Sequence, residues 1–269
     1  SQPSIKEDTL VLTGLANRAA FRSELDIAAR DSIAGFSVLF IDLDRFKAVN
    51  DALGHLVGDQ VLKLVSSRIR SLMNERDRLA RFGGDEFLLL HRHQAGSSSA
   101  VALGERVIGA LCAPFQFEGH EITLGASVGI AQHDPGDRPV DALIGDSDLA
   151  MYAAKKAGGN QVRVFDLQLA EETRRRTELE IELQLALKRR EFAVVYQPIV
   201  KLDTGEIAGF EALLRWEHPQ RGLLLPGSFL SLIQEAGMSV ALGQLVARRV
   251  VEFVASIHDR TRWVSVNVS

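Results

Sequence analysis

Short apolar runs alternate with stretches of helical spacing through the first 165 residues. The run F-S-V-L-F-I at 36–41 is rich in strand formers and typical of a central strand covered on both faces. Residues 59–73 repeat apolar positions at helical spacing, and 79–82 lead through two glycines into the apolar run 87–90. This pattern predicts a helix followed by a hairpin, and the alternation as a whole predicts an α/β sandwich.

The same alternation continues to residue 165 and then changes. It predicts a helix over 97–113, a strand over 121–132, a helix over 139–157 closed by Gly158-Gly159, and a strand over 161–165. Residues 166–190 are a charged helical stretch, in which Glu and Arg recur at spacings of three and four. We therefore predict a first domain over 1–165 and a linker, or first helix of the next domain, over 166–190.

Residues 191–269 predict a second, shorter domain. Its expected elements are a strand over 192–200, a turn at 203–205, a strand ending at Trp216, two helices and a strand over 263–268. A strand-helix repeat that stops at this point cannot close a barrel. We therefore expect this domain to be incomplete.

Composition limits the class of protein. With 46% hydrophobic and 25% charged residues, the chain can form two ordinary cores. A net charge of −4 and scattered Lys and Arg argue against a nucleic-acid partner. The single cysteine, Cys112, suits a reducing compartment and a place in the core. Without a long apolar run or signal-peptide pattern, we expect a cytoplasmic protein that meets a membrane only through segments before residue 1.

Carboxylates end the predicted central strand and recur at the hairpin. Asp42 and Asp44 form D-L-D, and the hairpin tip at 83–86 reads G-G-D-E. Mg²⁺ binds through one or two carboxylates plus substrate phosphates, so these acids suit a nucleotide-metal site. The paired glycines permit a tight turn and let a phosphate or base approach the backbone.

Each of these features also has an interpretation without a ligand. Asp44 suits the N-cap of a helix that begins near Arg45, and Gly-Gly is a common hairpin turn. The segment between strand and hairpin, however, is richer in polar groups than a packing helix requires. These groups are Lys47, Asn50, His55 and Asp59. Taken together, the features favour a ligand site.

Several ordered motifs carry a family resemblance over residues 10–165. They are D-L-D-R-F-K-A-V-N-D-A-L-G-H-L-V-G-D from residue 42, R-F-G-G-D-E-F from residue 81, L-T-G-L-A-N-R at 12–18, A-S-V-G-I-A at 126–131 and D-L-A-M-Y-A-A-K-K-A-G-G-N at 148–160. The chain thus resembles the GGDEF family of diguanylate cyclases. The resemblance implies a palm-like domain, with a central, mainly antiparallel sheet flanked by helices, that holds one GTP and two Mg²⁺ or Mn²⁺ ions.

The resemblance also implies roles for individual residues. The implied metal ligands are Asp42, Asp85 and the carbonyl of Leu43. The implied catalytic residues are Asp42, Lys47, Asp85 and Glu86. The implied substrate-binding residues are Phe46, Asn50, Asp59, Gly83, Gly84 and Lys155. Within these sets, Asn50 and Asp59 would bond guanine, and the two lysines would contact phosphates.

The implied reaction is attack of a ribose 3′-hydroxyl on an α-phosphate, assisted by the metal ions. Because each domain would hold one GTP, two chains must meet as a homodimer to form both bonds of cyclic di-GMP. One alternative is a catalytically weak, GTP-binding regulatory module that controls a phosphodiesterase domain. Another is a palm-type enzyme that acts on ATP, against which Asn50 and Asp59 argue.

Three positions depart from the family pattern. The product-inhibition motif R-x-x-D is N-E-R-D at 74–77, so its arginine is missing and feedback inhibition is not expected. Gly159 stands where many members carry an arginine, which predicts weaker GTP binding. Leu10 replaces an aspartate ahead of L-T-G-L, in a structural turn.

The second domain resembles the start of an EAL phosphodiesterase, a TIM-like barrel that hydrolyses cyclic di-GMP with two metals. The likeness rests on Y-Q-P-I-V at 196–200, G-F-E-A-L-L-R-W at 209–216, P-G-S-F-L-S-L-I-Q-E-A-G at 226–237 and V-S-V-N-V-S at 264–269. Glu211 and Asn267 match metal ligands, and Gln197 and Arg215 match substrate contacts. The set is incomplete, so we expect no hydrolysis from this chain alone.

Four histidines lie outside these motifs. His91, His93, His120 and His133 show no metal-ligand spacing with other His or Cys. We expect them on the surface or in loops.

Overall fold

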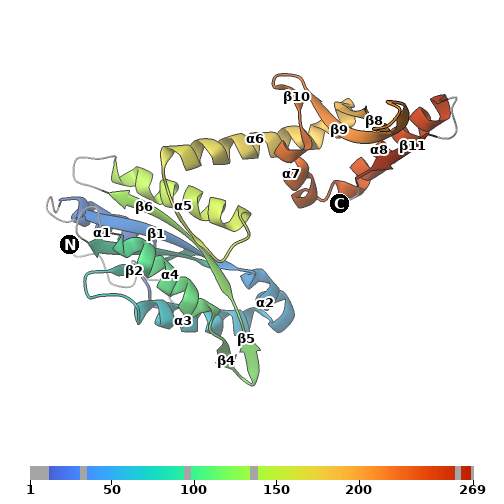
Figure 1. Cartoon of the computed structure of the whole chain (residues 1–269). Coiled ribbons are helices and arrows are strands. Elements are labelled where there is room, and N and C mark those ends of the chain that lie inside the picture. Colours follow the sequence, from blue (N-terminus) through green and yellow to red (C-terminus); the bar gives the residue numbers. More distant parts are fainter. Residues whose placement is uncertain (1–11, 31–34, 94–97, 134–138, 258–261, 268–269) are drawn as a thin grey trace. The chain divides into compact units, whose positions relative to one another are not determined.

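The computed structural model describes residues 12–30, 35–93, 98–133, 139–257 and 262–267. It divides into two compact units, Ser1–Thr173 and Arg174–Ser269. The division falls within the long helix α6 (Leu167–Arg189), labelled in Figure 1.

A five-stranded sheet of order β2-β3-β1-β6-β7 forms the centre of the first unit. β1 (Gly35–Asp44) pairs antiparallel with both β3 (Glu86–His93) and β6 (Gly125–His133). β2 (Arg78–Gly83) pairs antiparallel with β3, and β7 (Val162–Val164) pairs parallel with β6. This mainly antiparallel sheet confirms the predicted α/β, palm-like fold.

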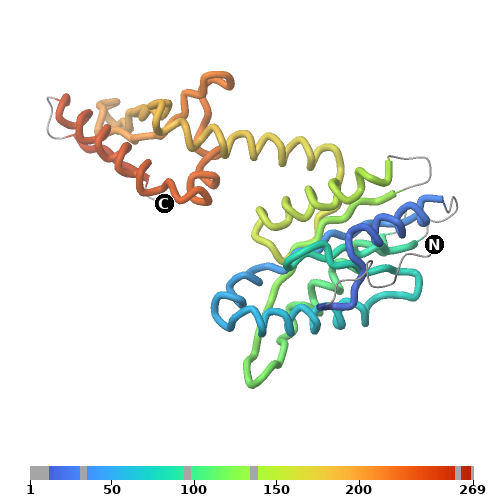
Figure 2. Tube along the Cα trace, turned by 180° about the vertical axis from the view of Figure 1, so that it is seen from behind, coloured from blue at the N-terminus to red at the C-terminus, as the bar shows by residue number. Residues whose placement is uncertain are grey.

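Helices cover both faces of this sheet, as Figures 1 and 2 show from opposite sides. Successive side chains of a strand point to opposite faces, so the apolar run of β1 supplies two cores. One core contains Phe36, Val38 and Phe40 with residues of α1 (Arg18–Arg30) and α5 (Val140–Lys156). The other contains Leu39, Ile41 and Leu43 with residues of α3 (His55–Arg70) and α4 (Ser99–Cys112).

The close approach of α5 to β6 depends on Gly129. A Cβ atom at this position would lie 2.0 Å from the Ser147 carbonyl oxygen and 2.1 Å from the Met151 nitrogen. These are backbone atoms of α5, so they move only if the helix moves. Gly129 therefore sets the distance between the helix and the sheet.

Two local predictions differ from the structure. The single strand predicted over 121–132 is wrong, because the chain forms β5 (His120–Ile122) and β6 separately: β5 pairs with β4 (Phe115–Phe117) in its own hairpin, whereas β6 pairs with β1. The helix predicted over 59–73 instead spans His55–Arg70, directly after α2 (Phe46–Leu53).

The placement expected for the four histidines is wrong for two of them. His91 in β3 and His133 in β6 are buried. His91 is satisfied on both ring nitrogens, with Nδ1 2.9 Å from Asp77 Oδ1 and Nε2 3.0 Å from Ser99 Oγ. A strand interior accepts a polar ring when such partners are present.

The second unit is built on an open, four-stranded sheet. β9 (Ile207–His218) pairs antiparallel with β8 (Phe192–Val200) and β10 (Gly222–Leu224), and parallel with β11 (Trp263–Val266). The segments η1 (Pro226–Ser228), α7 (Leu230–Glu235) and α8 (Ser239–Ser256) connect β10 to β11. Across the described residues the sheet does not close into a barrel, as predicted for a partial domain.

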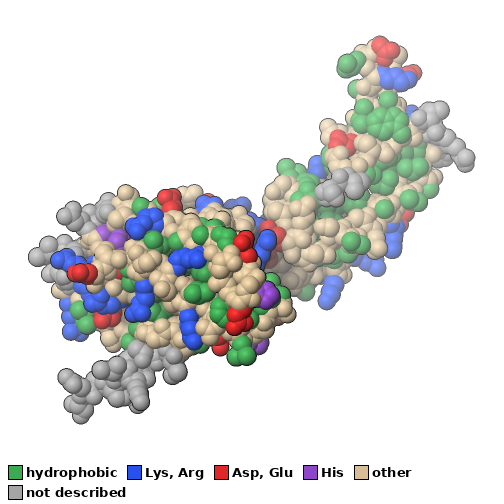
Figure 3. All heavy atoms as spheres, turned by 90° about the horizontal axis from the view of Figure 1, so that it is seen from below, with side chains coloured by type: hydrophobic (Ala, Val, Ile, Leu, Met, Phe, Trp, Pro, Cys, Tyr) green, Lys and Arg blue, Asp and Glu red, His purple; other side chains and the backbone are tan. Residues whose placement is uncertain are grey.

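Two surface features follow from the described residues. None of the helices described is both long and apolar enough to pass through a bilayer. On the face drawn in Figure 3, Lys and Arg side chains are dispersed among acidic and apolar ones.

We expect Gly129→Ala to lower the free energy of unfolding by at least about 3 kcal/mol, the upper end of overpacking costs, because the added Cβ meets helix backbone. Gly145→Ala is the matched control, since an added Cβ on this glycine of α5 meets nothing within 4 Å. The control should stabilise the chain by up to about 1 kcal/mol. Urea unfolding of the full chain measures both, and equal midpoints for the two variants would contradict the packing role of Gly129.

Candidate active site

Four of the predicted site residues meet at one end of the sheet. Asp42 in β1 lies opposite Glu86 in β3, and the Leu43 N–H donates to the Asp85 carbonyl oxygen over 3.3 Å. The strand pairing therefore joins the D-L-D segment to the glycine-tipped hairpin, although some forty residues separate them in sequence.

Lys155 of α5 neutralises the most buried of these acids. Its Nζ lies 2.7 Å from Asp42 Oδ1, and Asp42 is only 5% exposed. Burial raises the pKa of Asp42 and the charges of Asp85 and Asp44 raise it further, whereas the hydrogen bond and charge of Lys155 act in the opposite direction. Burial alone would lower the pKa of Lys155, but the acids around it, Asp42 foremost, raise that pKa.

Asp148 of α5 is a further acid in this group, to which sequence reasoning assigned no role. Burial raises the pKa of Glu86, and the charges of Asp42, Asp148 and Asp85 add to this effect. Burial also raises the pKa of Asp148 itself. The signal was present in the sequence, because Asp148 and Lys155 lie two helical turns apart and so share one face of α5.

The hairpin tip has open space beside its two glycines, and an arginine side chain of the same hairpin holds its backbone. Gly84 adopts a φ of +49°, and an added Cβ at Gly83 or Gly84 would meet nothing within 4 Å. The Arg81 guanidinium donates to the Gly84 carbonyl oxygen from Nε at 2.9 Å and from Nη2 at 2.6 Å. Arg81, which sequence reasoning missed, thus fixes the turn that presents Asp85.

The predicted guanine-binding residue Asn50 lies over a glycine of α3. A Cβ at Gly58 would stand 1.9 Å from Asn50 Oδ1 and 3.3 Å from Phe46 Cζ. Gly58 therefore makes room for Asn50, a role that sequence reasoning missed. Asp59 follows on α3, close enough to Arg81 for its charge to act on that guanidinium.

Lys47 is not brought into the acidic group. It is exposed on α2. Within the described part of the chain, it forms no ion pair with the site carboxylates. Its predicted role stays a prediction.

Asp44 does not cap a helix, so that alternative is wrong. α2 follows Arg45, which adopts a φ of +62°, and no side chain caps the helix start. The Asp44 carboxylate instead accepts hydrogen bonds from Ser127 Oγ at 2.8 Å and the Asn160 N–H at 2.7 Å. Tertiary contacts with β6 and with the turn after α5 supply the donors that a helix start would have offered.

The oxygen atoms at this site suit a cation that is bound together with phosphates. Carboxylates and a backbone carbonyl are the hard oxygen ligands that Mg²⁺ prefers. Among the described residues, no three His, Cys, Asp or Glu side chains converge closely enough to hold a metal by themselves. Mg²⁺ in nucleotide enzymes needs only one or two carboxylates, because the substrate supplies further oxygens.

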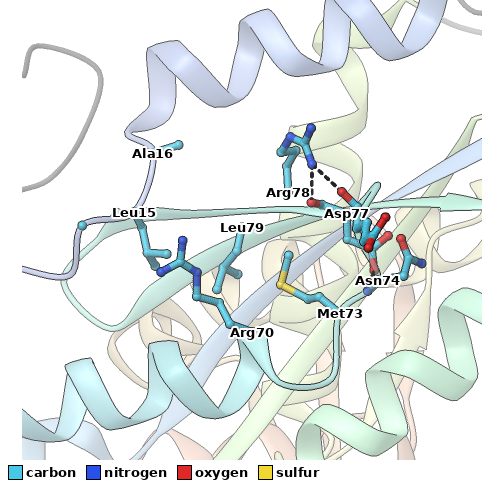
Figure 4. Close-up of a pocket in the computed structure, with 10 residues that line it drawn as sticks. Leu15, Ala16, Arg70, Met73, Asn74, Asp77, Arg78 and Leu79 are labelled. Carbon is cyan, nitrogen blue, oxygen red and sulfur yellow. Dashed lines mark hydrogen bonds between the residues drawn. The ribbon is translucent and has the colours of Figure 1, made fainter. Parts of the chain in front are cut away.

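The turn at 74–77 borders a cavity of about 450 Å³, drawn in Figure 4. Asp77 is buried, and its Oδ2 accepts the Asn74 N–H at 2.9 Å while its Oδ1 contacts His91. Arg78 donates to the carbonyl oxygens of Glu75 and Asp77. The carboxylate of N-E-R-D therefore serves the fold. Leu10 lies outside the described residues.

The second unit brings its two predicted metal ligands together. Asn267 Nδ2 donates to Glu211 Oε1 over 2.9 Å. Gln197 lies opposite Glu211 across the β8–β9 pair, and Arg215 follows Glu211 by four residues on the same face of β9. Gln197, Glu211 and Arg215 thus lie on one sheet, and Asn267 directly follows its strand β11.

Comparison with known families agrees with this geometry. A family model described as diguanylate cyclase, GGDEF domain, matches residues 8–161. The chain belongs to the GGDEF family. A model of the EAL domain matches residues 180–269, so the GGDEF domain is followed by an EAL domain.

Two similar proteins match most of the length of this chain. A Pseudomonas aeruginosa protein named bifunctional diguanylate cyclase/cyclic di-GMP phosphodiesterase MucR is 41% identical over 87% of this chain and 35% of its own length. The Escherichia coli cyclic di-GMP phosphodiesterase PdeR is 38% identical over 98% of this chain and 40% of its own length. The chain thus spans well under half of these relatives.

Solved structures support the fold of the GGDEF domain. The GGDEF domain of TpbB (YfiN) from Pseudomonas aeruginosa matches with a TM-score of 0.59 and 36% identity, over 62% of this chain and 99% of that one. The GGDEF domain of DgcB from Caulobacter crescentus, in complex with c-di-GMP, matches with a TM-score of 0.55 and 29% identity, over 61% of this chain and 97% of that one.

Lys155→Ala should destabilise the GGDEF domain more as the pH rises. Removing Lys155 leaves burial unopposed, so the pKa of Asp42 should rise further. A carboxyl with a higher pKa in the folded than in the unfolded chain holds its proton more tightly when folded. Its ionisation therefore disfavours folding, and this cost grows as the pH rises from the unfolded-state pKa to the folded-state pKa.

Urea midpoints of wild type and Lys155→Ala, compared between about pH 4 and about pH 8, measure this effect. Lys63→Ala removes an exposed lysine of α3 and serves as the control, with a difference from wild type that stays constant over this range. A Lys155→Ala difference that is equally constant would contradict the coupling to Asp42.

Proposed function

We propose that the GGDEF domain condenses two GTP molecules into cyclic di-GMP. The observation that carries this proposal is the meeting of Asp42, Asp85 and Glu86 beside Lys155 at one end of the sheet. Such a group offers hard oxygens for a cation and a cationic side chain for phosphates. The relative named bifunctional diguanylate cyclase/cyclic di-GMP phosphodiesterase supports the same reaction.

Different side chains of the site would bind the metal ions, the triphosphate and the guanine. Asp42, Asp85 and the Leu43 carbonyl would hold Mg²⁺ or Mn²⁺, and Lys155 would contact the triphosphate. Asn50 and Asp59 would accept hydrogen bonds from the guanine edge, while the open glycine turn leaves room for the nucleotide. When bound, the metal ions supply acidification of the ribose 3′-hydroxyl and stabilisation of charge on the α-phosphate.

Cyclic di-GMP has two phosphodiester bonds, so one domain with one GTP makes only half of it. We expect two chains to form a homodimer with their GGDEF sites facing each other across a two-fold axis. We expect this reaction in the cytoplasm, where GTP is available. The EAL domain would contribute Glu211 and Asn267, whose side chains are hydrogen-bonded over 2.9 Å, to a metal site.

A GTP-binding regulatory module is the second candidate function. Gly159 adopts a φ of +71°, and a Cβ there would lie 2.7 Å from Asp44 Oδ2, so this turn disfavours the arginine of many relatives. The relative PdeR is named only as a cyclic di-GMP phosphodiesterase, and a GGDEF domain that makes no product fits that name. Under this function the chain binds GTP without converting it.

Asp85→Asn should reduce formation of cyclic di-GMP by at least about 100-fold, more than the loss typical of a residue that only supports a metal ligand. Each variant is incubated at high protein concentration with GTP and Mg²⁺, and the cyclic di-GMP formed is quantified by chromatography. Asp51→Asn, which alters an exposed acid of α2, should retain wild-type turnover. Wild-type chain that binds GTP but forms no product would support the regulatory module instead.

Gly58→Ala should weaken the preference for GTP over ATP by about tenfold, the effect of losing roughly one hydrogen bond. The added Cβ displaces Asn50 Oδ1, which is the end of a side chain, so folding should change little. Gly109→Ala on α4 is the control, since its Cβ would meet nothing within 4 Å. Affinities for the two nucleotides by calorimetry test this, and an unchanged preference would remove Asn50 from guanine recognition.

A further inference from the structure

Asp44 joins three segments that are distant in sequence. It ends β1, and its Oδ1 accepts a hydrogen bond from the Ser127 hydroxyl of β6 over 2.8 Å. Its Oδ2 accepts the Asn160 N–H at 2.7 Å, in the turn between α5 and β7. A Cβ at Gly125 would lie 3.1 Å from the same Oδ2, so a glycine of β6 leaves the space that this carboxylate occupies.

The turn held by Asp44 has an unusual backbone. Gly158, Gly159 and Asn160 have φ values of +112°, +71° and +51° in succession. A positive φ is disfavoured for a residue with a Cβ, so Asn160 needs stabilising contacts to remain in this conformation. Its N–H to Asp44 is such a contact, and the Cys112 thiol lies 3.1 Å from Asn160 Oδ1.

Lys155 lies in the last turn of α5, and Gly158, where the turn held by Asp44 begins, follows it by three residues. The Gly158 N–H donates to the Lys155 carbonyl oxygen over 3.2 Å, and the Gly159 N–H donates to the Ala154 carbonyl oxygen over 3.1 Å. Any shift of the turn is therefore passed directly to the backbone of Lys155. Asp44 and Asp42 lie two residues apart on one face of β1, so the same strand end holds the turn and receives the Lys155 side chain.

We propose that Asp44 is a positioning residue for Lys155. Its carboxylate holds the end of α5 against β1 and β6. This keeps the Lys155 ammonium group beside Asp42, where it would contact the triphosphate of GTP. The second part of this statement rests on the proposed function. In the structure both oxygens of Asp44 accept hydrogen bonds from protein groups, and the role assigned to it is structural.

The test combines a crystal structure with a double-mutant cycle on the full chain. In Asp44→Ala, we expect Lys155 Nζ to leave Asp42 and the turn to lose protection from amide hydrogen exchange. GTP affinity should fall by about 10- to 100-fold, the loss typical when a supporting partner is removed. Asp44→Ala should cause no further loss of affinity in the Lys155→Ala background, because its effect acts through Lys155.

Two further variants separate positioning from general damage. Asp44→Asn keeps the shape of the side chain, but its amide NH₂ would face either the Ser127 hydroxyl or the Asn160 N–H and could not accept a hydrogen bond from it. This variant should therefore show part of the loss of GTP affinity. Ser127→Ala removes one of the two bonds and should have a smaller effect than Asp44→Ala. Asp51→Asn should match wild type. Equal losses from Asp44→Ala with and without Lys155 would overturn the proposal.

The two proposals fail in different ways. If the wild-type chain does not bind GTP, the proposed function fails, and the crystal structure of Asp44→Ala still decides the role of Asp44. If GTP binds but Lys155 Nζ remains beside Asp42 in that variant, the positioning role is wrong while the proposed function stands.

Discussion

The GGDEF domain is organised around negative charge held at the end of a buried strand. Asp42 is almost fully buried, with Glu86 opposite it and Asp85 next along the hairpin. Burial and like charge both disfavour the ionised forms of Asp42 and Glu86, so the group needs a cation. Lys155 supplies it, and the contacts that place Lys155 gain importance for that reason. Gly129 sets the height of α5 over the sheet, and Asp44 holds the end of that helix.

Elements whose signal is local could be predicted from the sequence. The apolar run of β1, the glycine-tipped hairpin and the glycine pair after α5 are each decided within a few residues, and all three form as expected. The missed helix α1 carries a comparable signal, since Phe21, Leu25 and Ala28 recur at spacings of four and three and are buried. The convergence of Asp42, Asp85 and Glu86 followed from the family motifs, whose spacing already encodes the strand pairing.

Features that depend on distant partners could not be predicted in this way. Asp44 has two choices, a local helix start or tertiary donors, and the donors lie 83 and 116 residues along the chain. His91 looks like a surface residue until β3 brings it beside Asp77, which buries and satisfies the ring. Gly58 and Asn50 become partners only when α2 and α3 pack together. In each case one side chain has several reasonable local environments, and the topology selects between them.

The N-E-R-D turn at 74–77 also depends on a distant partner, His91. The family motif pairs an arginine with an aspartate, whereas Asp77 here is buried and contacts both the Asn74 N–H and His91. A carboxylate used in this way has little capacity left for a ligand. An arginine at position 74 would therefore lack the second half of its motif unless His91 released Asp77. With no arginine at position 74 and with Asp77 engaged in this way, we expect the turn to serve the fold and not a ligand.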